Sequence, residues 1–300
     1  MIKKHLLFLF CFVALSLSAQ ENGEYDWWNE LHDWEQGDPS WKDYIIMAPR
    51  YLGPNALPVP EVKKGIITPN SEFEFTISNH FHPGDPTEDI SAKIFIPFAK
   101  NKIAVEFYGV ILEHYSFSEK IRDERFARDR DGKGYAAGDL NFSTVIQIFK
   151  DRKFPNTLLR FTGRTASATK MSAARYTDTP GYFFDLSFSR PTHDKTDNIL
   201  VPFGSFGFYC WQTNDDKNFQ NDAYMYAAGL DYLKSNWLFS ASVSGYSGYK
   251  KYDKPVQLNV DIRKDLNQKT AIRFQYLNGF RDWEYKTIRF SFFWKFNPVP

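Results

Sequence analysis

Charged side chains stand at every second position along several stretches of this sequence, with apolar residues between them. Acidic and basic groups on one face of a strand can pair with one another and fill a polar interior, or they can line a narrow polar pore. In a pore, arginines would favour carboxylate-bearing solutes, because a guanidinium holds a carboxylate through two parallel hydrogen bonds. The sequence leaves both interpretations open. The charged positions are Glu72, Glu74, Lys93, Glu106, Asp139, Arg160, Arg164, Asp185, Asp231, Asp261, Arg263, Arg273 and Arg289.

Histidines offer a second kind of chemistry. His80 and His82 lie at the end of one alternating stretch, and Glu113 and His114 end another. Imidazole is a general base and a common metal ligand near neutral pH. A hydrolase acting on lipids needs a nucleophile beside such a base, and no serine stands in a recognisable motif with these histidines. We expect rim residues without chemistry, and keep His80, His82 and His114 as weak candidates for catalysis.

An acidic stretch raises the question of a metal site. Asp129 and Asp131 are followed by glycines, a spacing similar to that of a calcium loop. However, Lys133 occupies the third acidic position, and no glutamate closes the loop. We therefore expect a charged, solvated loop, no metal and no cofactor, with Asp129 and Asp131 as weak metal candidates.

Residues 1–19 predict a secretory signal peptide. Lys3 and Lys4 precede an apolar run too short to span a bilayer, and small residues lead to a cleavage point after Ala19. Lipoprotein processing at Cys11 is the alternative, but bulky residues precede that cysteine. Cleavage would leave Cys210, so an internal disulfide is excluded, and its position predicts an unreactive residue facing lipid.

The rest of the chain contains no apolar run near twenty residues, which excludes a transmembrane helix. Only helices and closed barrels satisfy the backbone inside lipid, so a barrel is the remaining way to span a membrane. Aromatic residues make up 18% of the chain, and the interfacial girdles of a membrane barrel would accommodate them. The formal net charge of +1 gives no support for nucleic-acid binding.

The elements that would position these side chains are strands of alternating polarity. In residues 287–296, Ile288, Phe290, Phe292 and Trp294 share one parity, and the length suits a tilted strand across a bilayer core. The pattern recurs from residue 71 and predicts an antiparallel up-and-down transmembrane β-barrel of about twelve strands. The expected strands cover residues 72–78, 91–98, 103–108, 139–148, 159–164, 182–189, 205–208, 224–232, 237–244, 256–263, 272–276 and 287–296.

Connection lengths support the barrel, because short links alternate with longer ones, including one at 214–221. In bacterial barrels the short turns are periplasmic and the long loops lie outside. Parity places Asp261 opposite Arg273 as a cross-strand ion pair. Closure of the last strand on the first would place Arg289 beside Glu72 and Glu74.

Residues 20–70 do not resemble strands. Trp27, Leu31 and Trp34 are spaced to share one face of a short helix, and four prolines between residues 49 and 60 then force an extended path. We expect a packed extension that caps the periplasmic mouth. A plug inside the lumen and a docking surface for a periplasmic partner stay open as alternatives. The residues of such a plug or partner surface are Trp27, Trp28, Leu31, Trp34 and Trp41.

With these features together, residues 71–296 resemble the outer-membrane β-barrel proteins of Gram-negative bacteria. The resemblance implies a location in the outer membrane, contact with its lipid, and recognition by the barrel-insertion machinery through the C-terminal strand. That strand ends on the aromatic Phe296, although residues 297–300 follow it. We expect a channel or binding protein for small polar solutes, anionic ones included. The alternatives are a hydrolase or lipid-modifying barrel, and a non-conducting barrel that docks a periplasmic partner.

Overall fold

The computed structural model describes residues 23–150, 153–192, 198–215 and 217–297. The predicted signal peptide and Cys11 lie outside these residues. The chain divides into two compact units, Met1–Pro39 and Ser40–Pro300. Among the described residues, no helix is long and apolar enough to cross a membrane.

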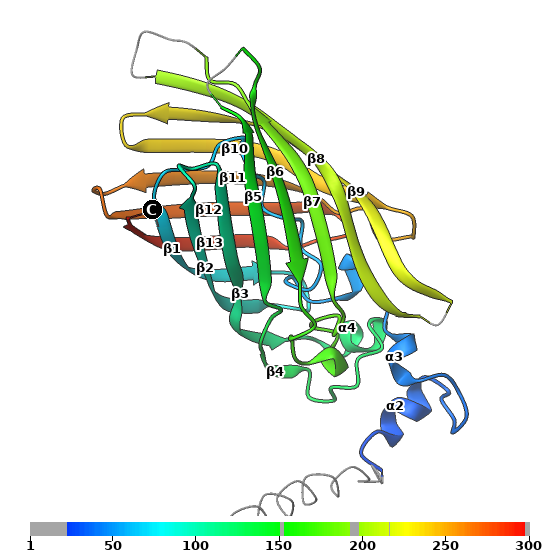
Figure 1. Ribbon diagram of the computed structural model, residues 1–300. Coiled ribbons are helices and arrows are strands. Elements are labelled where there is room, and N and C mark those ends of the chain that lie inside the picture. The colour runs from blue at the N-terminus through cyan, green and yellow to red at the C-terminus, as the bar shows by residue number, and fades with distance from the viewer. Residues whose placement is uncertain (1–22, 151–152, 193–197, 216, 298–300) are drawn as a thin grey trace, which may run out of the picture. The chain divides into compact units, whose positions relative to one another are not determined.

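Twelve strands in the described part of the chain form a closed antiparallel barrel, as predicted (Figure 1). Each strand pairs with its neighbour along the chain, and β13 closes the ring on β1. The short β4 (Lys133–Ala136) extends one end of β3. The barrel strands are β1 (Ser71–Phe81), β2 (Thr87–Phe98), β3 (Ile103–Ser116), β5 (Asn141–Phe149), β6 (Asn156–Arg164), β7 (Gly181–Ser189), β8 (Asn198–Asp215), β9 (Asn218–Lys234), β10 (Trp237–Gly248), β11 (Val256–Asp265), β12 (Thr270–Arg281) and β13 (Lys286–Phe296).

Alternation along each strand separates an outer apolar surface from a polar interior. On β13, Phe290 is 51% exposed, whereas Ser291 is fully buried. Phe293, the apolar exception on the inner parity, packs against the guanidinium groups of Arg263 and Arg273, 4.3 Å and 5.4 Å from its ring centroid. An aromatic ring is tolerated inside because it offers a negative face to these cations.

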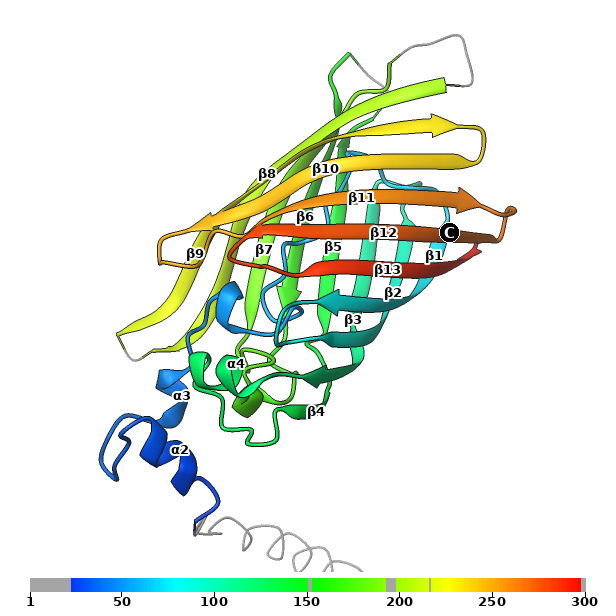
Figure 2. The same ribbon diagram turned by 180° about the vertical axis from the view of Figure 1, so that it is seen from behind.

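The connections differ in length at the two ends of the barrel (Figure 2). One end carries the link that contains α4 (Glu119–Glu124) and β4, and the link that contains the 3₁₀ turn η2 (Met171–Ala173). We call this the long-loop end and the opposite one the short-turn end. The predicted long connection at 214–221 is wrong, because β8 and β9 extend into it to Asp215 and from Asn218.

In the N-terminal unit, α2 (Asp26–Leu31) is a helix of six residues. Its buried residue is Trp28, while Leu31 is 47% exposed. The predicted apolar face of Trp27, Leu31 and Trp34 is therefore wrong. The helix ends before Trp34, whose indole N–H donates to the carbonyl of Pro39 at 2.9 Å.

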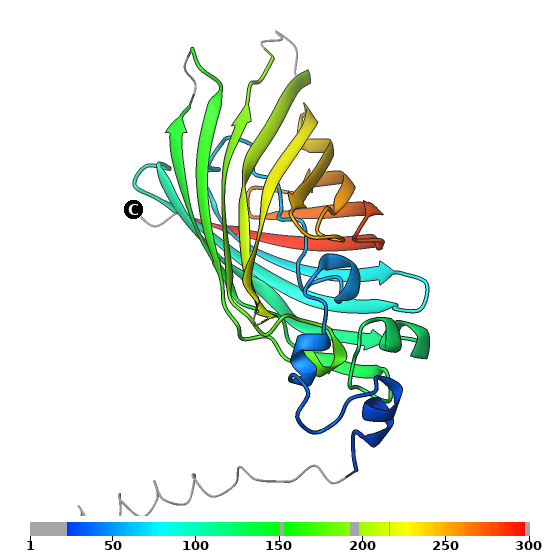
Figure 3. The same cartoon turned by 90° about the vertical axis from the view of Figure 1, so that its right-hand side faces the viewer.

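Residues 40–70 belong to the barrel unit and cross its interior (Figure 3). They begin at the long-loop end, where α3 (Trp41–Tyr44) lies with the Trp41 ring 5.2 Å from the Arg128 guanidinium. The 3₁₀ turn η1 (Pro49–Tyr51) follows. The path finishes at the short-turn end, where Ile67 bonds Gln147. Residues 41–51 thus lie at the long-loop mouth, whereas a cap over the periplasmic mouth would lie at the short-turn end if short turns face the periplasm.

The predicted pairing of Asp261 with Arg273 is also wrong. Asp261 lies opposite Gln275, whose side-chain amide donates to it at 3.0 Å, and Arg263 lies opposite Arg273. The turn is centred one residue later than predicted, which moves each partner by two positions. Side-chain parity is unchanged by such a shift.

Candidate functional site: a polar lumen crossed by the chain itself

The barrel interior contains a stretch of the chain's own N-terminal region, residues 53–68, which we call the lumen segment. Prolines in this stretch hold the backbone extended and lack the N–H that a strand or helix would use. The buried carbonyl oxygens of the segment therefore accept hydrogen bonds from side chains of the barrel. Three wall side chains provide them. The bonds are Arg164 Nη1 to Ala56 O at 2.6 Å, Tyr246 Oη to Leu57 O at 2.8 Å and Trp283 Nε1 to Pro54 O at 3.0 Å.

The N-terminal half of the lumen segment, with Leu52 just before it, is also packed by apolar contacts. Leu52 and Leu57 are buried in one cluster with Tyr209, Trp211 and Tyr246 of the wall. Burial of aliphatic side chains against aromatic rings stabilises a contact by roughly 1.5–3 kcal/mol per residue. This half is therefore the anchored part of the segment.

Charged side chains hold the middle of the segment. Glu61 accepts hydrogen bonds from Lys93 at 2.7 Å and from Arg273 at 3.2 Å. Glu74 accepts from Arg273 and lies 3.0 Å from Lys93. These four residues, which we call the central ion-pair group, contain two acids and two bases. Their mutual pairing is the condition under which buried charges are tolerated.

The segment makes further polar contacts towards the short-turn end. Lys63 pairs with Glu106, and Lys64 donates to Asp231 at 2.8 Å. Gly65 follows with φ of +75°, and a Cβ there would lie 2.7 Å from the Asn156 carbonyl oxygen. Only glycine fits this backbone conformation and this close approach.

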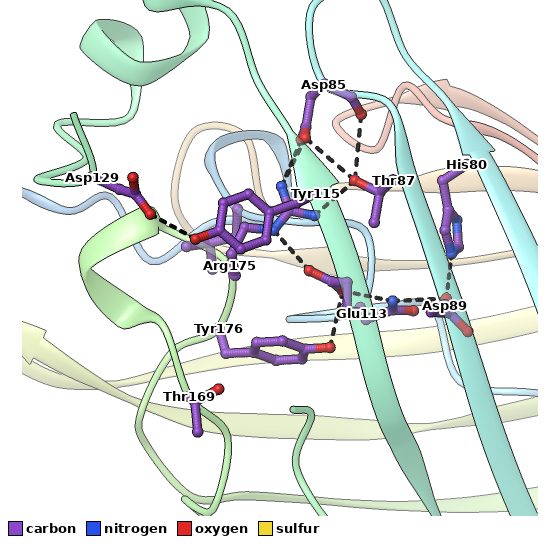
Figure 4. Close-up of polar contacts among 12 residues, drawn as sticks. His80, Asp85, Thr87, Asp89, Glu113, Tyr115, Asp129, Thr169, Arg175 and Tyr176 are labelled. Carbon is purple, nitrogen blue, oxygen red and sulfur yellow. Dashed lines mark hydrogen bonds and ion pairs between the residues drawn. The ribbon is translucent and has the colours of Figure 1, made fainter. Parts of the chain in front are cut away.

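A second charged group closes the long-loop end (Figure 4). Arg175, which is fully buried, donates to Asp85 at 2.8 Å and to Glu113 at 2.8 Å. Arg125 donates to Asp85 at 2.7 Å, and the Tyr176 hydroxyl donates to Glu113 at 2.9 Å. We call these five residues the outer cluster. It joins the β1–β2 link, β3 and the connections after β3 and β6.

Electrostatics in the outer cluster favour the charged forms. Burial alone would raise the pKa of Asp85, but Arg175 and Arg125 bring that pKa below its ordinary value. Burial would likewise lower the pKa of Arg175, but Glu113 and Asp85 raise it above the ordinary value. The cluster is therefore an ionised network in which each partner keeps the other charged.

The outer cluster also holds the start of the lumen segment. The Asn55 amide donates to Glu113 at 2.9 Å and to Asp89 at 3.0 Å. A Cβ on Gly53 would lie 2.7 Å from Cζ of Arg175, so the segment backbone packs directly on the guanidinium. The loop arginine and the segment therefore constrain each other.

Two cavities of the described interior lie beside the segment. One, of about 210 Å³, faces the long-loop end and is lined by Asn55, Arg164 and Trp283. The other, of about 220 Å³, faces the short-turn end and is lined by Lys64, Glu72 and Arg263. The central ion-pair group lines both cavities and thus lies between them.

The charged positions singled out from the sequence are distributed over these cavities and their ion pairs. Glu74, Lys93, Glu106, Asp139, Arg160, Arg164, Arg273 and Arg289 line the first cavity. Glu72, Asp261 and Arg263 line the second. Asp185 pairs with Arg160 at 2.6 Å, and Asp231 binds Lys64. Burial raises the pKa of Asp139, which lies in the connection before β5.

Arg289 does not lie beside Glu72 and Glu74, contrary to the prediction. Its partner on β1 is Ser78, whereas Glu72 faces Lys295. Instead, Arg263 pairs with Glu72 at 2.6 Å, and Arg273 pairs with Glu74.

The histidine candidates do not converge. His80 is buried between Asp89, at 2.6 Å from Nε2, and Thr287, at 2.8 Å from Nδ1. This chain of contacts resembles a nucleophile–base–acid relay, but the hydroxyl-bearing Thr287 is fully buried and lines neither cavity, so a substrate would not reach the group that would attack it. His82 packs on Tyr285, and burial with Arg125 nearby lowers its pKa. His114 points away and packs on Tyr135.

The metal candidates take part in ordinary loop contacts. Asp129 accepts from the Tyr115 hydroxyl at 2.6 Å and from the Gly132 backbone at 3.2 Å. Within the described ranges, no group of three or more acidic, histidine or cysteine side chains is arranged to hold a metal ion. Cys210 lies on the outward parity of β8, as predicted, opposite Tyr182, but neighbouring side chains leave it only 2% exposed.

Sequence reasoning missed the residues that hold the segment. Glu61, Lys63 and Lys64 follow a proline-rich stretch, and the charges there were the available signal. Asp85, Arg125 and Arg175 lie in connections, where no periodicity marks a buried position.

No family model and no curated protein matches this sequence. Solved structures do match in fold. An outer membrane channel from Pseudomonas putida F1 is 11% identical with a TM-score of 0.53, covering 79% of this chain and 100% of that one. The chain has the fold of outer-membrane β-barrels. The KdgM porin (11% identical, TM-score 0.48, 75% of this chain and 99% of that one) and the NanC porin (11%, 0.46, 74% and 100%) are less similar.

Proposed function

We propose that this protein is a small-solute channel of the Gram-negative outer membrane whose path runs beside the lumen segment. The proposal rests on one observation. Two cavities of about 210 and 220 Å³, each with charged side chains in its wall, lie along the segment, and the central ion-pair group stands between them. Withdrawal of Glu61 from Lys93 and Arg273 would join the cavities without unpacking the anchored apolar half of the segment.

The side chains that line the two cavities determine which solutes could pass. Each cavity presents acidic and basic side chains with amides and hydroxyls, beside apolar side chains such as Val59 and Trp283 in the first and Leu158 in the second. A solute that carries polar or charged groups on a small hydrocarbon frame would therefore match the walls. Both spaces are small, at about 210 and 220 Å³. The described interior therefore favours small polar solutes over oligomers. The outer cluster is a second barrier at the long-loop end.

Reconstitution in liposomes tests this function. The wild-type protein should admit small polar solutes slowly, and a variant lacking residues 41–64 should admit them faster and accept larger ones. Heat-modifiable migration on a gel would show that both barrels are folded. Folded proteins that leave the liposomes impermeable in both forms would refute the channel.

A further inference from the structure

One cation of the lumen forms no direct ion pair among the described residues. Arg289, on the inner face of β13, lines the 210 Å³ cavity between its cross-strand neighbours Ser78 and Gln275. In the part of the chain that the structure describes, its Nε has no hydrogen-bond partner and its guanidinium forms no ion pair within 4 Å. Arg289 is half-buried, but its Nε is buried, and a buried N–H without an acceptor is energetically costly unless a solvent species compensates it.

The other basic groups around this cavity are compensated. Arg160 pairs with Asp185 at 2.6 Å, and Lys93 and Arg273 belong to the central ion-pair group. Arg164 bonds the segment carbonyl of Ala56 and lies 3.9 Å from Asp139.

The acidic side chain of Asp89 attracts Arg289 at longer range but directs its own hydrogen bonds elsewhere. Asp89 on β2 and Arg289 on β13 flank Ser78 of β1, one on each side. The Oδ2 of Asp89 accepts hydrogen bonds from His80 at 2.6 Å and from Asn55 at 3.0 Å. Gln275 beside Arg289 also keeps a buried Oε1 without a partner. The polar groups around Arg289 are thus arranged for a species that the chain does not supply.

We infer that Arg289 is the binding residue for a small monocarboxylate solute in the 210 Å³ cavity. A guanidinium matches a carboxylate through two parallel bonds. Arg289 offers one guanidinium without a direct partner among the described residues, while the acidic side chains Glu74, Asp89 and Glu106 of the same cavity disfavour a second negative charge on the solute. The cavity volume limits the solute to a few carbon atoms. This inference names the solute class of the channel proposed above and rests on that proposal for its biological meaning.

Calorimetric titration of the purified full-length protein with lactate tests the site. The wild type should bind lactate. Arg289→Gln should weaken binding at least tenfold, and Arg289→Lys, which keeps the charge without the planar fork, should fall between them. Arg281→Gln is the matched control, because it removes an exposed guanidinium outside the cavity. Trp283, which lines the cavity, gives a fluorescence signal as a second readout.

Neutral and dianionic probes define the class. Lactamide and inorganic phosphate should bind at least tenfold more weakly than lactate. The inference is overturned if lactate does not bind, if Arg289→Gln binds it as the wild type does, or if either probe binds equally well. Equilibrium binding requires no conduction, so binding without liposome flux would retain the site and refute the channel. Liposome flux without lactate binding would retain the channel and refute the site.

Discussion

Glu61 of the lumen segment and Lys93 of β2 form an ion pair of 2.7 Å across the interior of the barrel. The pair joins a residue outside the sheet to the wall, and Arg273 and Glu74 extend it to β12 and β1. The interior is thus divided by charged side chains from four parts of the chain: the lumen segment, β1, β2 and β12. Reversible ionic contacts, rather than apolar packing, hold the middle of the segment.

Loss of Arg175 should destabilise the barrel strongly. Arg175→Met would leave Asp85 and Glu113 buried beside fewer cations. Removal of one member of a buried ion pair costs about 3–5 kcal/mol. Thermal or denaturant unfolding in detergent would measure the loss, with Arg281→Met as the exposed control. An unchanged midpoint would show that the outer cluster contributes nothing to stability.

Loss of Arg289, in contrast, should not lower the stability of the barrel. Because its guanidinium forms no direct ion pair among the described residues, Arg289→Met breaks no hydrogen-bonded pair, and Asp89 keeps its bonds from His80 and Asn55. We expect a stability equal to or greater than that of the wild type in the absence of carboxylates, by the same unfolding measurement. A loss as large as that of Arg175→Met would mean that Arg289 is a structural ion-pair member.

Gly65→Ala should destabilise the segment more than Gly37→Ala. Both glycines have positive φ, so both substitutions strain the backbone. At Gly65 the new Cβ would also lie 2.7 Å from backbone atoms of Asn156 and Ser189, whereas nothing lies within 4 Å at Gly37. We expect an additional loss of about 1–3 kcal/mol at Gly65. Equal effects would contradict the described path of the segment against the wall.

Stability should fall as the pH rises through neutrality because of Asp253. Burial raises the pKa of this carboxyl, which lies in the β10–β11 connection, to about 7, and Asp282 adds to the effect. The folded protein therefore binds the proton more tightly than the unfolded chain does. The stabilising contribution is complete below about pH 3.8 and is lost as the pH rises through about 7.

Asp253→Asn tests this account, because it keeps the shape and removes the titration. Unfolding midpoints of the wild type should fall between pH 5 and 8, while the variant should lose at least half of that slope. The difference at high pH would be up to about 4 kcal/mol, from about 1.4 kcal/mol per pKa unit. Parallel profiles of the two proteins would exclude Asp253 as the titrating group.

Residues at the start of the barrel unit should be accessible from outside the cell. Lys42 lies in α3 near Asp178, at the long-loop end. With short turns facing the periplasm, this end is external. A membrane-impermeant maleimide should label Lys42→Cys in intact cells, and should label Ser235→Cys, in a short turn, only after permeabilisation. The buried Cys210 gives little background. The reverse pattern would invert the orientation.

The sequence predicted the barrel because alternation is a local property that each strand carries by itself. Pairing details depend on turn geometry, so Asp261 was assigned to Arg273 although Gln275 is its partner. The lumen segment could not be placed in this way. Glu61 and Arg273 are 212 positions apart, and no periodicity in a proline-rich stretch indicates which wall residues it meets. The loop residue Arg175 likewise gave no sign of its burial.

The most direct test of the proposed path is single-channel conductance of Glu61→Ala in planar bilayers. Removal of this carboxylate takes away the part of the central ion-pair group that the segment contributes, and so should join the two cavities. Glu124→Ala, an exposed change on α4, is the control and should behave as the wild type does. We expect a severalfold larger conductance for Glu61→Ala than for either. A folded Glu61→Ala barrel that conducts no more than the wild type would contradict a path beside the lumen segment.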